Sequence, residues 1–180
     1  MIHIGIDPGF TGAIATYDDE RDEWHVYDMP CTYATTTTRL KSGKFKIRTD
    51  LDLPRLVRLL FEQINSCEAI TATIEKAQPM RKTAQGATQG TSSTGRYMQA
   101  YGMILGALAA LSVPYTEVRA LTWKRKMAVP SNKSLAIQLA IELIKPLANQ
   151  LTRQKDHGRA EAGLLCLYNL KHSLAKQRYN

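Results

Sequence analysis

Four acidic residues stand where this chain leaves an apolar run or enters a helical pattern, and their side chains are the best suited to chemistry. Asp7 ends the first apolar run, and Glu75 ends a later β-branched run. Asp156 and Glu161 lie five positions apart at the start of the last helical pattern. A carboxylate at the tip of a buried strand is costly unless it binds a cation or hydrogen-bond donors. The pattern therefore predicts a cation site assembled from distant parts of the chain.

Converging carboxylates repel one another unless divalent cations neutralise them, and ligation by oxygen alone favours Mg²⁺ or Mn²⁺. Two such ions about 4 Å apart are suited to phosphodiester hydrolysis. His157 lies four residues before Glu161 on one helix face, which makes it a candidate metal ligand or proton carrier. Asp156 lies five residues before Glu161, about 140° away on an ideal helix, and reaches the same site only if the first turn bends.

Each acid also has an ordinary structural interpretation. Asp7 precedes a tight turn and is a candidate turn aspartate. Glu75 could be an exposed strand end paired with Lys76, and Asp156 could serve only to cap a helix. Glu161 could be a solvated helix residue paired with a lysine or arginine. These alternatives remain open at the level of sequence.

The elements that position these acids follow from the apolar spacing. Residues 2–7, 12–18 and 23–28 are predicted to form an antiparallel meander, followed by a basic loop or hairpin at 30–50 around Ser42-Gly43. The later segments are predicted as a helix capped by Asp50 or Asp52, a strand at 69–75, a loop at 77–93, a helix at 94–111, a strand at 114–118, a basic turn at 122–126, a helix from Ser131 or Asn132 to about Lys145, and a helix from Asp156 to about Lys171.

This order predicts an α/β fold, in which a mixed central sheet of three antiparallel strands and then parallel strands is flanked by helices. If the strands at 2–7 and 69–75 are neighbours, Asp7 and Glu75 emerge side by side at one edge. The last helix could then bring Glu161 against them. The helix at 94–111 carries an apolar stripe that suits either a dimer surface or a buried core helix.

The bulk properties indicate one soluble domain with a polyanionic partner. The chain has 180 residues, of which 44% are hydrophobic, and we expect a single domain at 1–172 followed by a flexible tail at 173–180. A net charge of +8 favours nucleic acid as the partner. Three widely spaced cysteines favour a reducing cytosol, and no leader or membrane span is apparent, so we expect a cytoplasmic protein without a membrane partner.

At this point the chain resembles the RuvC-type Holliday junction resolvases, specifically the short versions found in phages. The matching segments, in the family's order over residues 2–172, are Ile4-Gly5-Ile6-Asp7-Pro8-Gly9 with Thr11-Gly12, Thr73-Ile74-Glu75-Lys76, Ser92-Ser93-Thr94-Gly95-Arg96 with Tyr101-Gly102, Val118 with Trp123-Lys124, and Lys155-Asp156-His157-Gly158-Arg159-Ala160-Glu161-Ala162. The resemblance implies a ribonuclease H-like fold, a homodimer, and Mg²⁺-dependent paired nicking of four-way DNA junctions. It further implies two Mg²⁺ ions in each active site, replaceable by Mn²⁺, and action in the host cell's cytoplasm or nucleoid.

Carried over residue by residue, the resemblance assigns Asp7 and Glu75 to the family's first two acids. Glu161 resembles the last acid, and its partner on the helix is Asp156 or His157. Many cellular members also carry an aromatic wedge shortly after the second acid. Here that segment offers only Pro79 and Met80, which departs from the family pattern.

Cations near the acids are the expected phosphate contacts, and they predict salt-sensitive, sequence-independent DNA binding. The candidates are Lys76, Arg81, Lys82, Arg96, Lys124, Lys155 and Arg159. A second group, on the segment at 30–50, comprises Lys41, Lys44, Lys46 and Arg48. Trp123 is expected in the core in preference to a base-stacking role.

Three other functions compete with junction cleavage. Another ribonuclease H-like nuclease would act on flap DNA, other branched DNA or an RNA–DNA hybrid. An actin-like or sugar-kinase-like phosphotransferase would use the turn after Asp7 as its first phosphate loop, but 180 residues lack the second lobe that it needs. A non-catalytic DNA binder would keep the scaffold, although carboxylates impair phosphate binding unless a metal lies between them.

Overall fold

The central sheet has the mixed arrangement that the sequence predicts. The structure, a computed structural model, describes residues 1–65, 69–78 and 90–177. Five strands lie in the order β3-β2-β1-β6-β7, with bounds β1 (Ile2–Asp7), β2 (Ala13–Asp18), β3 (Glu23–Asp28), β6 (Ile70–Glu75) and β7 (Tyr115–Val118). The pairs β1–β2 and β2–β3 are antiparallel, whereas β1–β6 and β6–β7 are parallel. The predicted neighbours, the first strand and the strand at 69–75, are therefore confirmed.

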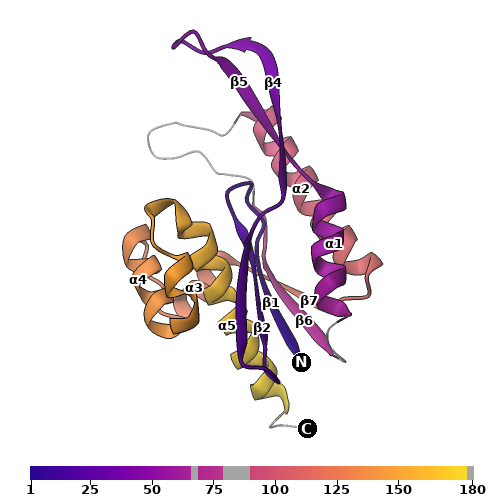
Figure 1. The fold of residues 1–180 in the computed structure, drawn as a ribbon, viewed down its shortest axis with the longest axis vertical. Helices are drawn as coiled ribbons and strands as arrows, with labels where there is room; N and C mark the ends of the chain where they lie inside the picture. Colours follow the sequence, from indigo (N-terminus) through magenta and orange to yellow (C-terminus); the bar gives the residue numbers. More distant parts are fainter. Residues whose placement is uncertain (66–68, 79–89, 178–180) are drawn as a thin grey trace.

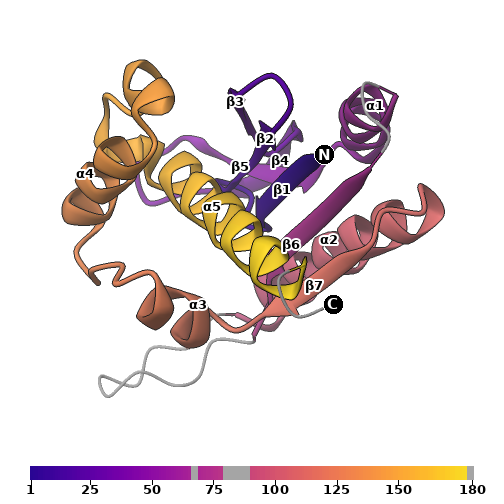
Figure 2. The ribbon, with the colours of Figure 1, turned by 90° about the horizontal axis from the view of Figure 1, so that it is seen from below.

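Helices cover both faces of this sheet (Figures 1 and 2). On one side lie α1 (Leu53–Ile64) and α2 (Thr91–Ala110), and on the other lie α3 (Ala120–Lys126), α4 (Lys133–Leu143) and α5 (His157–Gln177). The first side buries Ile4 and Ile6 of β1 against helical leucines and isoleucines. The second side buries Trp123 with the apolar faces of α4 and α5. Alternate residues of β2 thus belong to two separate cores, with Ile14 in the first and Ala13 and Ala15 in the second, as expected for a sheet covered on both faces.

Two of the helix starts are fixed by the caps that the sequence offers. The Asp52 carboxylate accepts a hydrogen bond from the Arg55 backbone N–H at 3.1 Å at the start of α1. The Asn132 side chain accepts from the Ser134 and Leu135 N–H groups at 2.9 and 3.2 Å at the start of α4. Asp52 and Asn132 are therefore the caps, among the pairs of candidates that the sequence left open.

Helix α5 approaches β1 so closely that glycine is required at the contact. A Cβ atom on Gly5 would lie 2.2 Å from the Cys166 backbone nitrogen and 2.3 Å from the Ala162 carbonyl oxygen. A Cβ atom on Gly158 would lie 2.3 Å from the Thr11 carbonyl oxygen. Two backbone contacts therefore hold the first turns of α5 against β1 and the turn that follows Asp7.

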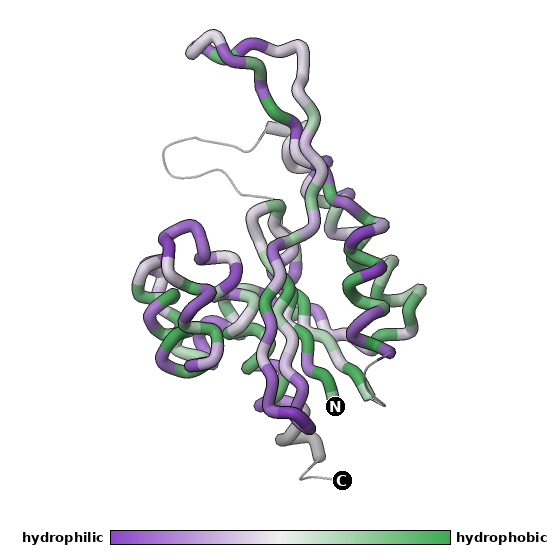
Figure 3. The backbone as a smooth tube through the Cα atoms, in the orientation of Figure 1, coloured by the Kyte–Doolittle hydropathy of each residue, from purple (hydrophilic) through white to green (hydrophobic). Residues whose placement is uncertain are grey.

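The basic segment at 30–50 forms the predicted hairpin. Strands β4 (Cys31–Arg39) and β5 (Phe45–Leu51) pair with each other alone, and Gly43 takes a positive φ of 80° at the turn. Figure 1 shows the hairpin projecting far beyond the body, at the end of the sheet where β1 and β6 terminate. Figure 3 shows hydrophilic, intermediate and hydrophobic residues mixed along the hairpin.

Some predicted boundaries are wrong. The basic turn at 122–126 is part of helix α3, because the buried Trp123 gives this charged segment one apolar face. Helix α2 begins at Thr91, α4 ends at Leu143, and α5 continues to Gln177. Most of the predicted loop at 77–93 lies outside the described residues. None of the helices in the described part of the chain combines the length and hydropathy that crossing a membrane requires.

Candidate active site

The sheet places Asp7 and Glu75 next to each other. They are the last residues of the parallel neighbours β1 and β6, whose register pairs Ile6 with Ile74 one position earlier. The carboxyl ends of parallel neighbours meet at the same edge of a sheet. Glu161 comes from the second turn of α5, the helix that packs on β1 through Gly5. Three acids that are distant in sequence therefore converge at one sheet edge.

Helix α3 supplies the groups that hold two of these carboxylates. The Lys124 ammonium donates to Glu161 Oε1 at 2.5 Å and lies 4.0 Å from Glu75 Oε2. The indole Nε1 of Trp123 donates to the same Glu75 oxygen at 2.8 Å. Trp123 is fully buried, so the direction of this N–H is fixed by core packing. Glu75 is thereby oriented from the core, and Glu161 is neutralised by one lysine.

Among the described residues, Asp7 has no comparable partner. Burial and the negative charges of Glu161 and Glu75 raise the pKa of its carboxyl from 3.8 to about 7, against the opposing effects of the Gly9 N–H and Lys124. The Gly9 N–H contact is long, at 3.3 Å. Burial, together with Glu161, likewise raises the pKa of Glu75, although Trp123 and Lys124 act in the other direction. The cluster is thus short of positive charge, and a bound cation would relieve it.

These oxygens suit a hard divalent cation, because Mg²⁺ and Mn²⁺ prefer carboxylate ligands. Within residues 1–65, 69–78 and 90–177, no three His, Cys, Asp or Glu side chains are arranged to coordinate one metal ion. The Lys124 ammonium contacts both glutamates instead. The carboxylate oxygens are of the right chemical type for such a cation, but a metal ion bound between the two glutamates would have to displace the Lys124 ammonium.

The structure distinguishes the two candidates that precede Glu161. His157 Nε2 lies 3.1 Å from Glu161 Oε1. Burial lowers the pKa of His157, with further contributions from the positive charges of Lys133 and Lys124, although Glu161 opposes them. His157 therefore belongs to the carboxylate cluster, and its imidazole is mostly neutral near neutral pH.

Asp156 is used differently. Its side chain is 2% exposed and accepts hydrogen bonds from the Arg153 backbone N–H at 2.8 Å and from the Arg153 guanidinium at 2.7 Å. Arg153 also holds the pKa of Asp156 below its usual range. This carboxylate closes the short helical turn η2 (Gln154–Asp156), as its structural interpretation predicts.

The other structural interpretations fare less well. Glu161 is 9% exposed, so it is not a solvated residue, but it does pair with a lysine, Lys124, as its structural interpretation predicts. Lys76 lies 4.0 Å from Glu117 and is not the partner of Glu75, whose contacts come from α3. Asp7 does accept the Gly9 N–H as a turn aspartate would, but this contact leaves its charge uncompensated.

Lys124 and Arg159, two of the predicted phosphate contacts, donate hydrogen bonds within the protein, and a third, Lys76, lies near Glu117. Lys124 lies inside the carboxylate cluster. Arg159 forms a bidentate pair with Asp28 at 2.6 and 2.7 Å and also donates to the Gln150 carbonyl. Arg159 therefore ties the start of α5 to β3, and its role as a DNA contact stays a prediction.

The remaining predicted contacts differ in position. Lys76 and Lys155 are exposed beside the ends of β6 and α5. Arg96 lies on α2 and lines a groove next to Phe10, which follows Asp7 by three residues. Arg81 and Lys82 lie outside the described residues, as do Pro79 and Met80.

Two site residues escaped the sequence analysis. Tyr97 lies near the cluster, where burial and the charges of Asp7 and Glu75 raise its pKa to about 12. Trp123 was expected in the core, which is confirmed, but its hydrogen bond to Glu75 was not foreseen. Trp123 and Lys124 lie on one short helix, α3. A helical interpretation of residues 120–126 would therefore have suggested that Trp123 reaches the acids together with Lys124.

Comparison with known proteins identifies the fold. No family model matches the sequence, and no curated protein matches it. Among solved structures, RuvC from T. thermophilus in complex with a Holliday junction substrate is 13% identical, covers 97% of this chain and 96% of its own, and superposes with a TM-score of 0.58. Another Thermus thermophilus RuvC structure is 14% identical, covers 96% and 95%, and has a TM-score of 0.53. The chain thus has the fold of RuvC over nearly its whole length, and the predicted fold class is confirmed.

Proposed function

We propose that this protein is a divalent-metal-dependent endonuclease that cuts branched DNA, with the four-way junction as its substrate. The observation that carries the proposal is the convergence of Asp7, Glu75 and Glu161 around Lys124 at the carboxyl ends of β1 and β6. The shared fold supports it, because one of the matching proteins was solved with a Holliday junction. The net charge of +8 suits a polyanionic substrate.

Asp7, Glu75 and Glu161 are the residues that would hold the metal, and His157 is the nearest additional ligand. Two Mg²⁺ ions, or Mn²⁺ in their place, supply a nucleophilic water and neutralisation of the leaving oxygen when bound. Trp123 fixes the orientation of Glu75 from the core. Lys124, released from the glutamates, is free to bind a phosphate oxygen of the substrate.

His157 is suited to moving a proton during hydrolysis. Its Nε2 lies 3.1 Å from Glu161, and its lowered pKa leaves the imidazole neutral near neutral pH. A neutral imidazole that donates its Nε2–H to Glu161 can accept a proton at Nδ1, and Glu161 stabilises the resulting cation.

A homodimer acting on DNA in the cytoplasm completes the proposal. A four-way junction is nearly two-fold symmetric, so two copies of one active site related by a dyad would place symmetric nicks. Of the stripe that the sequence offers as a dimer surface, Tyr101 and Leu108 are buried in the core, whereas Met98 is exposed and Leu105 is half-buried. Only Met98 and Leu105 of this stripe are therefore left for a dimer contact.

The direct test is cleavage by the Asp7→Asn variant of labelled synthetic DNA in Mg²⁺. The wild type should cut a four-way junction in two symmetric strands, and Asp7→Asn should cut at least a hundredfold more slowly, by about 3 kcal/mol in activation free energy. Glu142→Gln, which neutralises an exposed acid on α4, is the matched control and should cut normally. Preference for flap DNA or an RNA–DNA hybrid would identify a different nuclease, and no cleavage of any substrate by the wild type would refute the proposal.

A second pair of variants tests the assignment of the helix residue. His157→Ala should abolish cutting, because this imidazole contacts Glu161. Asp156→Asn should lower stability but retain cutting at temperatures where the variant is folded, because Asp156 is bound to Arg153. The reverse outcome would place Asp156 in the catalytic set.

A further inference from the structure

A groove lies between the base of the hairpin and helix α2. Its larger part has a volume of about 330 Å³ and is lined by Phe10, Arg48 and Arg96 together with apolar residues of α2. An adjoining part of about 260 Å³ is lined by Phe10, Arg96 and Tyr97 from one side and by Ile47 of β5 from the other. The hairpin thus provides one wall, and the turn after Asp7 together with α2 provides the rest.

Arg96 is the residue of this groove with a buried polar atom that lacks a hydrogen-bond partner among the described residues. Its Nε atom is buried and has no hydrogen-bond partner anywhere in the described part of the chain. The nearby acid of the groove, Asp50, is already bound by Arg48 at 2.7 Å. A buried guanidinium N–H without an acceptor costs free energy, and the acceptor that matches its planar fork best is a carboxylate or a phosphate. An anion bound in the groove would supply the acceptor that Arg96 Nε lacks among the described residues.

The groove adjoins the carboxylate cluster. Phe10 lines both of its parts and follows Asp7 by three residues. Tyr97, next to Arg96 on α2, is close enough to Asp7 and Glu75 to experience their charges. A phosphate held by Arg96 would thus lie near the carboxylate cluster.

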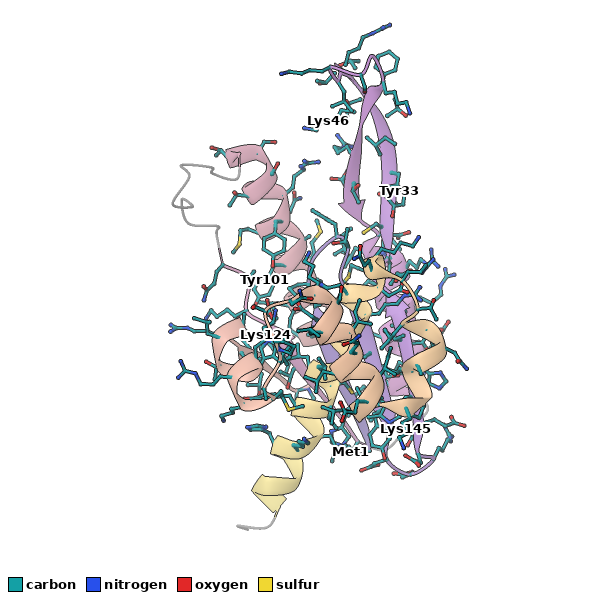
Figure 4. All side chains as sticks on the ribbon, turned by 90° about the vertical axis from the view of Figure 1, so that its left-hand side faces the viewer. Met1, Tyr33, Lys46, Tyr101, Lys124 and Lys145 are labelled. Atoms are coloured by element: carbon teal, nitrogen blue, oxygen red, sulfur yellow. The ribbon has the colours of Figure 1, made fainter. Side chains whose placement is uncertain are left out.

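The hairpin continues the positive charge away from the groove. Residues 31–49 contain five basic residues and no acidic one, and the basic residues are Arg39, Lys41, Lys44, Lys46 and Arg48. Tyr33 is 72% exposed and Ile47 is 61% exposed, so large apolar side chains accompany these cations on a surface without a core. Figure 4 shows Tyr33 and Lys46 on the hairpin, well beyond the part of the body that carries Lys124.

We infer that the groove is a phosphate subsite and that the groove and the hairpin form one continuous track for a nucleic-acid backbone. Arg96 binds a backbone phosphate near the one at the carboxylates, and the hairpin's cations hold the strand or arm that continues outward. This inference rests on the proposed nuclease function and extends it, since it states where the bound DNA leaves the site. A polyanion with regularly spaced phosphates would satisfy both Arg96 and the row of exposed lysines on the hairpin, Lys41, Lys44 and Lys46.

The test of the groove is the binding of a fluorescent four-way DNA junction in Ca²⁺ over a range of salt concentrations. Arg96→Gln should weaken binding by about tenfold and lower the slope of log affinity against log salt by about one. Arg96→Lys should keep the slope, because the charge is retained. Arg58→Gln, which removes an exposed arginine from α1, is the matched control and should change neither quantity. Equal affinity and slope for Arg96→Gln and the wild type would overturn the subsite.

The test of the hairpin is a triple variant in which Lys41, Lys44 and Lys46 are changed to Gln. These residues are exposed and far from the core, so the variant should fold normally. We expect the salt slope to fall by about two to three and the affinity for a four-way junction to fall with it. An unchanged slope would limit the track to the groove and overturn its extension.

Cleavage in Mg²⁺ separates this inference from the proposed function. A wild type that cuts DNA, together with an Arg96→Gln variant that binds like the wild type, would refute the subsite alone. An Arg96→Gln variant that binds weakly while the wild type binds but never cuts would support the track and refute the nuclease. A wild type that neither binds nor cuts would overturn both.

Discussion

Asp7→Asn should stabilise the protein when metal is absent, although Asp7 is the first acid of the proposed site. Burial and the neighbouring acids raise the pKa of Asp7 from 3.8 to about 7. Each unit of pKa is worth about 1.4 kcal/mol, so ionising Asp7 in the folded protein costs at most about 4 kcal/mol. Because the side chain is partly exposed, we expect Asp7→Asn to gain about 2–4 kcal/mol near about pH 8 in EDTA.

The sign of the pH dependence follows from the raised pKa. The folded state binds a proton at Asp7 more tightly than the unfolded state, so this contribution to stability is complete below about pH 4 and is lost as the pH rises to about 7. The difference in free energy of unfolding between the wild type and Asp7→Asn should therefore increase as the pH rises over that range. Urea denaturation at several pH values measures it.

Asp156→Asn is the matched comparison, for which the pH dependence of stability has the opposite sign. Arg153 lowers the pKa of Asp156, so its contribution to stability is present above about pH 4 and is lost as the pH falls. Asp156→Asn should thus lose about 1–2 kcal/mol near neutral pH. Mg²⁺ should stabilise the wild type but not Asp7→Asn. If Asp7→Asn unfolds more easily than the wild type near about pH 8 in EDTA, the claim of an uncompensated carboxylate is wrong.

Three further substitutions probe the groups around the carboxylates. Trp123→Phe should lower the free energy of unfolding by about 1–3 kcal/mol in urea denaturation, because Glu75 loses its indole donor; a neutral result would show that this bond has no net value. Lys124→Met should lower the free energy of unfolding by about 1–3 kcal/mol in EDTA. In thermal unfolding, Mg²⁺ should stabilise this variant more than the wild type, since a bound cation replaces the missing ammonium. Gly5→Ala should cost more than about 3 kcal/mol because its Cβ would meet the α5 backbone, whereas Gly106→Ala on open helix surface should be neutral or stabilising by about 1 kcal/mol.

The positions of Asp7 and Glu75 could be predicted because strand ends are marked in the sequence. Apolar runs stop at both residues, and the fold's parallel pairing of β1 with β6 brings such ends together. The contact of His157 with Glu161 also follows from helical spacing, since they are four residues apart. These parts of the site depend on local patterns together with one long-range pairing.

The remaining parts depend on packing that no local pattern reveals. Arg159 pairs with Asp28, 131 positions away, so its engagement could not be read from the helix that carries it. Lys124 enters the cluster because burial of Trp123 turns a charged segment into helix α3. The Nε atom of Arg96 is buried without a partner among the described residues because the hairpin and α2 pack beside each other, and no local pattern indicates this packing.

The central claim is that Asp7, Glu75 and Glu161 together bind divalent metal ions. Calorimetric titration of Mg²⁺, and of Mn²⁺, into the wild type and into Asp7→Asn, Glu75→Gln and Glu161→Gln tests it most directly. The wild type should bind these ions with release of protons, since the raised pKa of Asp7 leaves it partly protonated at neutral pH, and each variant should lose binding. Unaltered metal affinity in all three variants would contradict it.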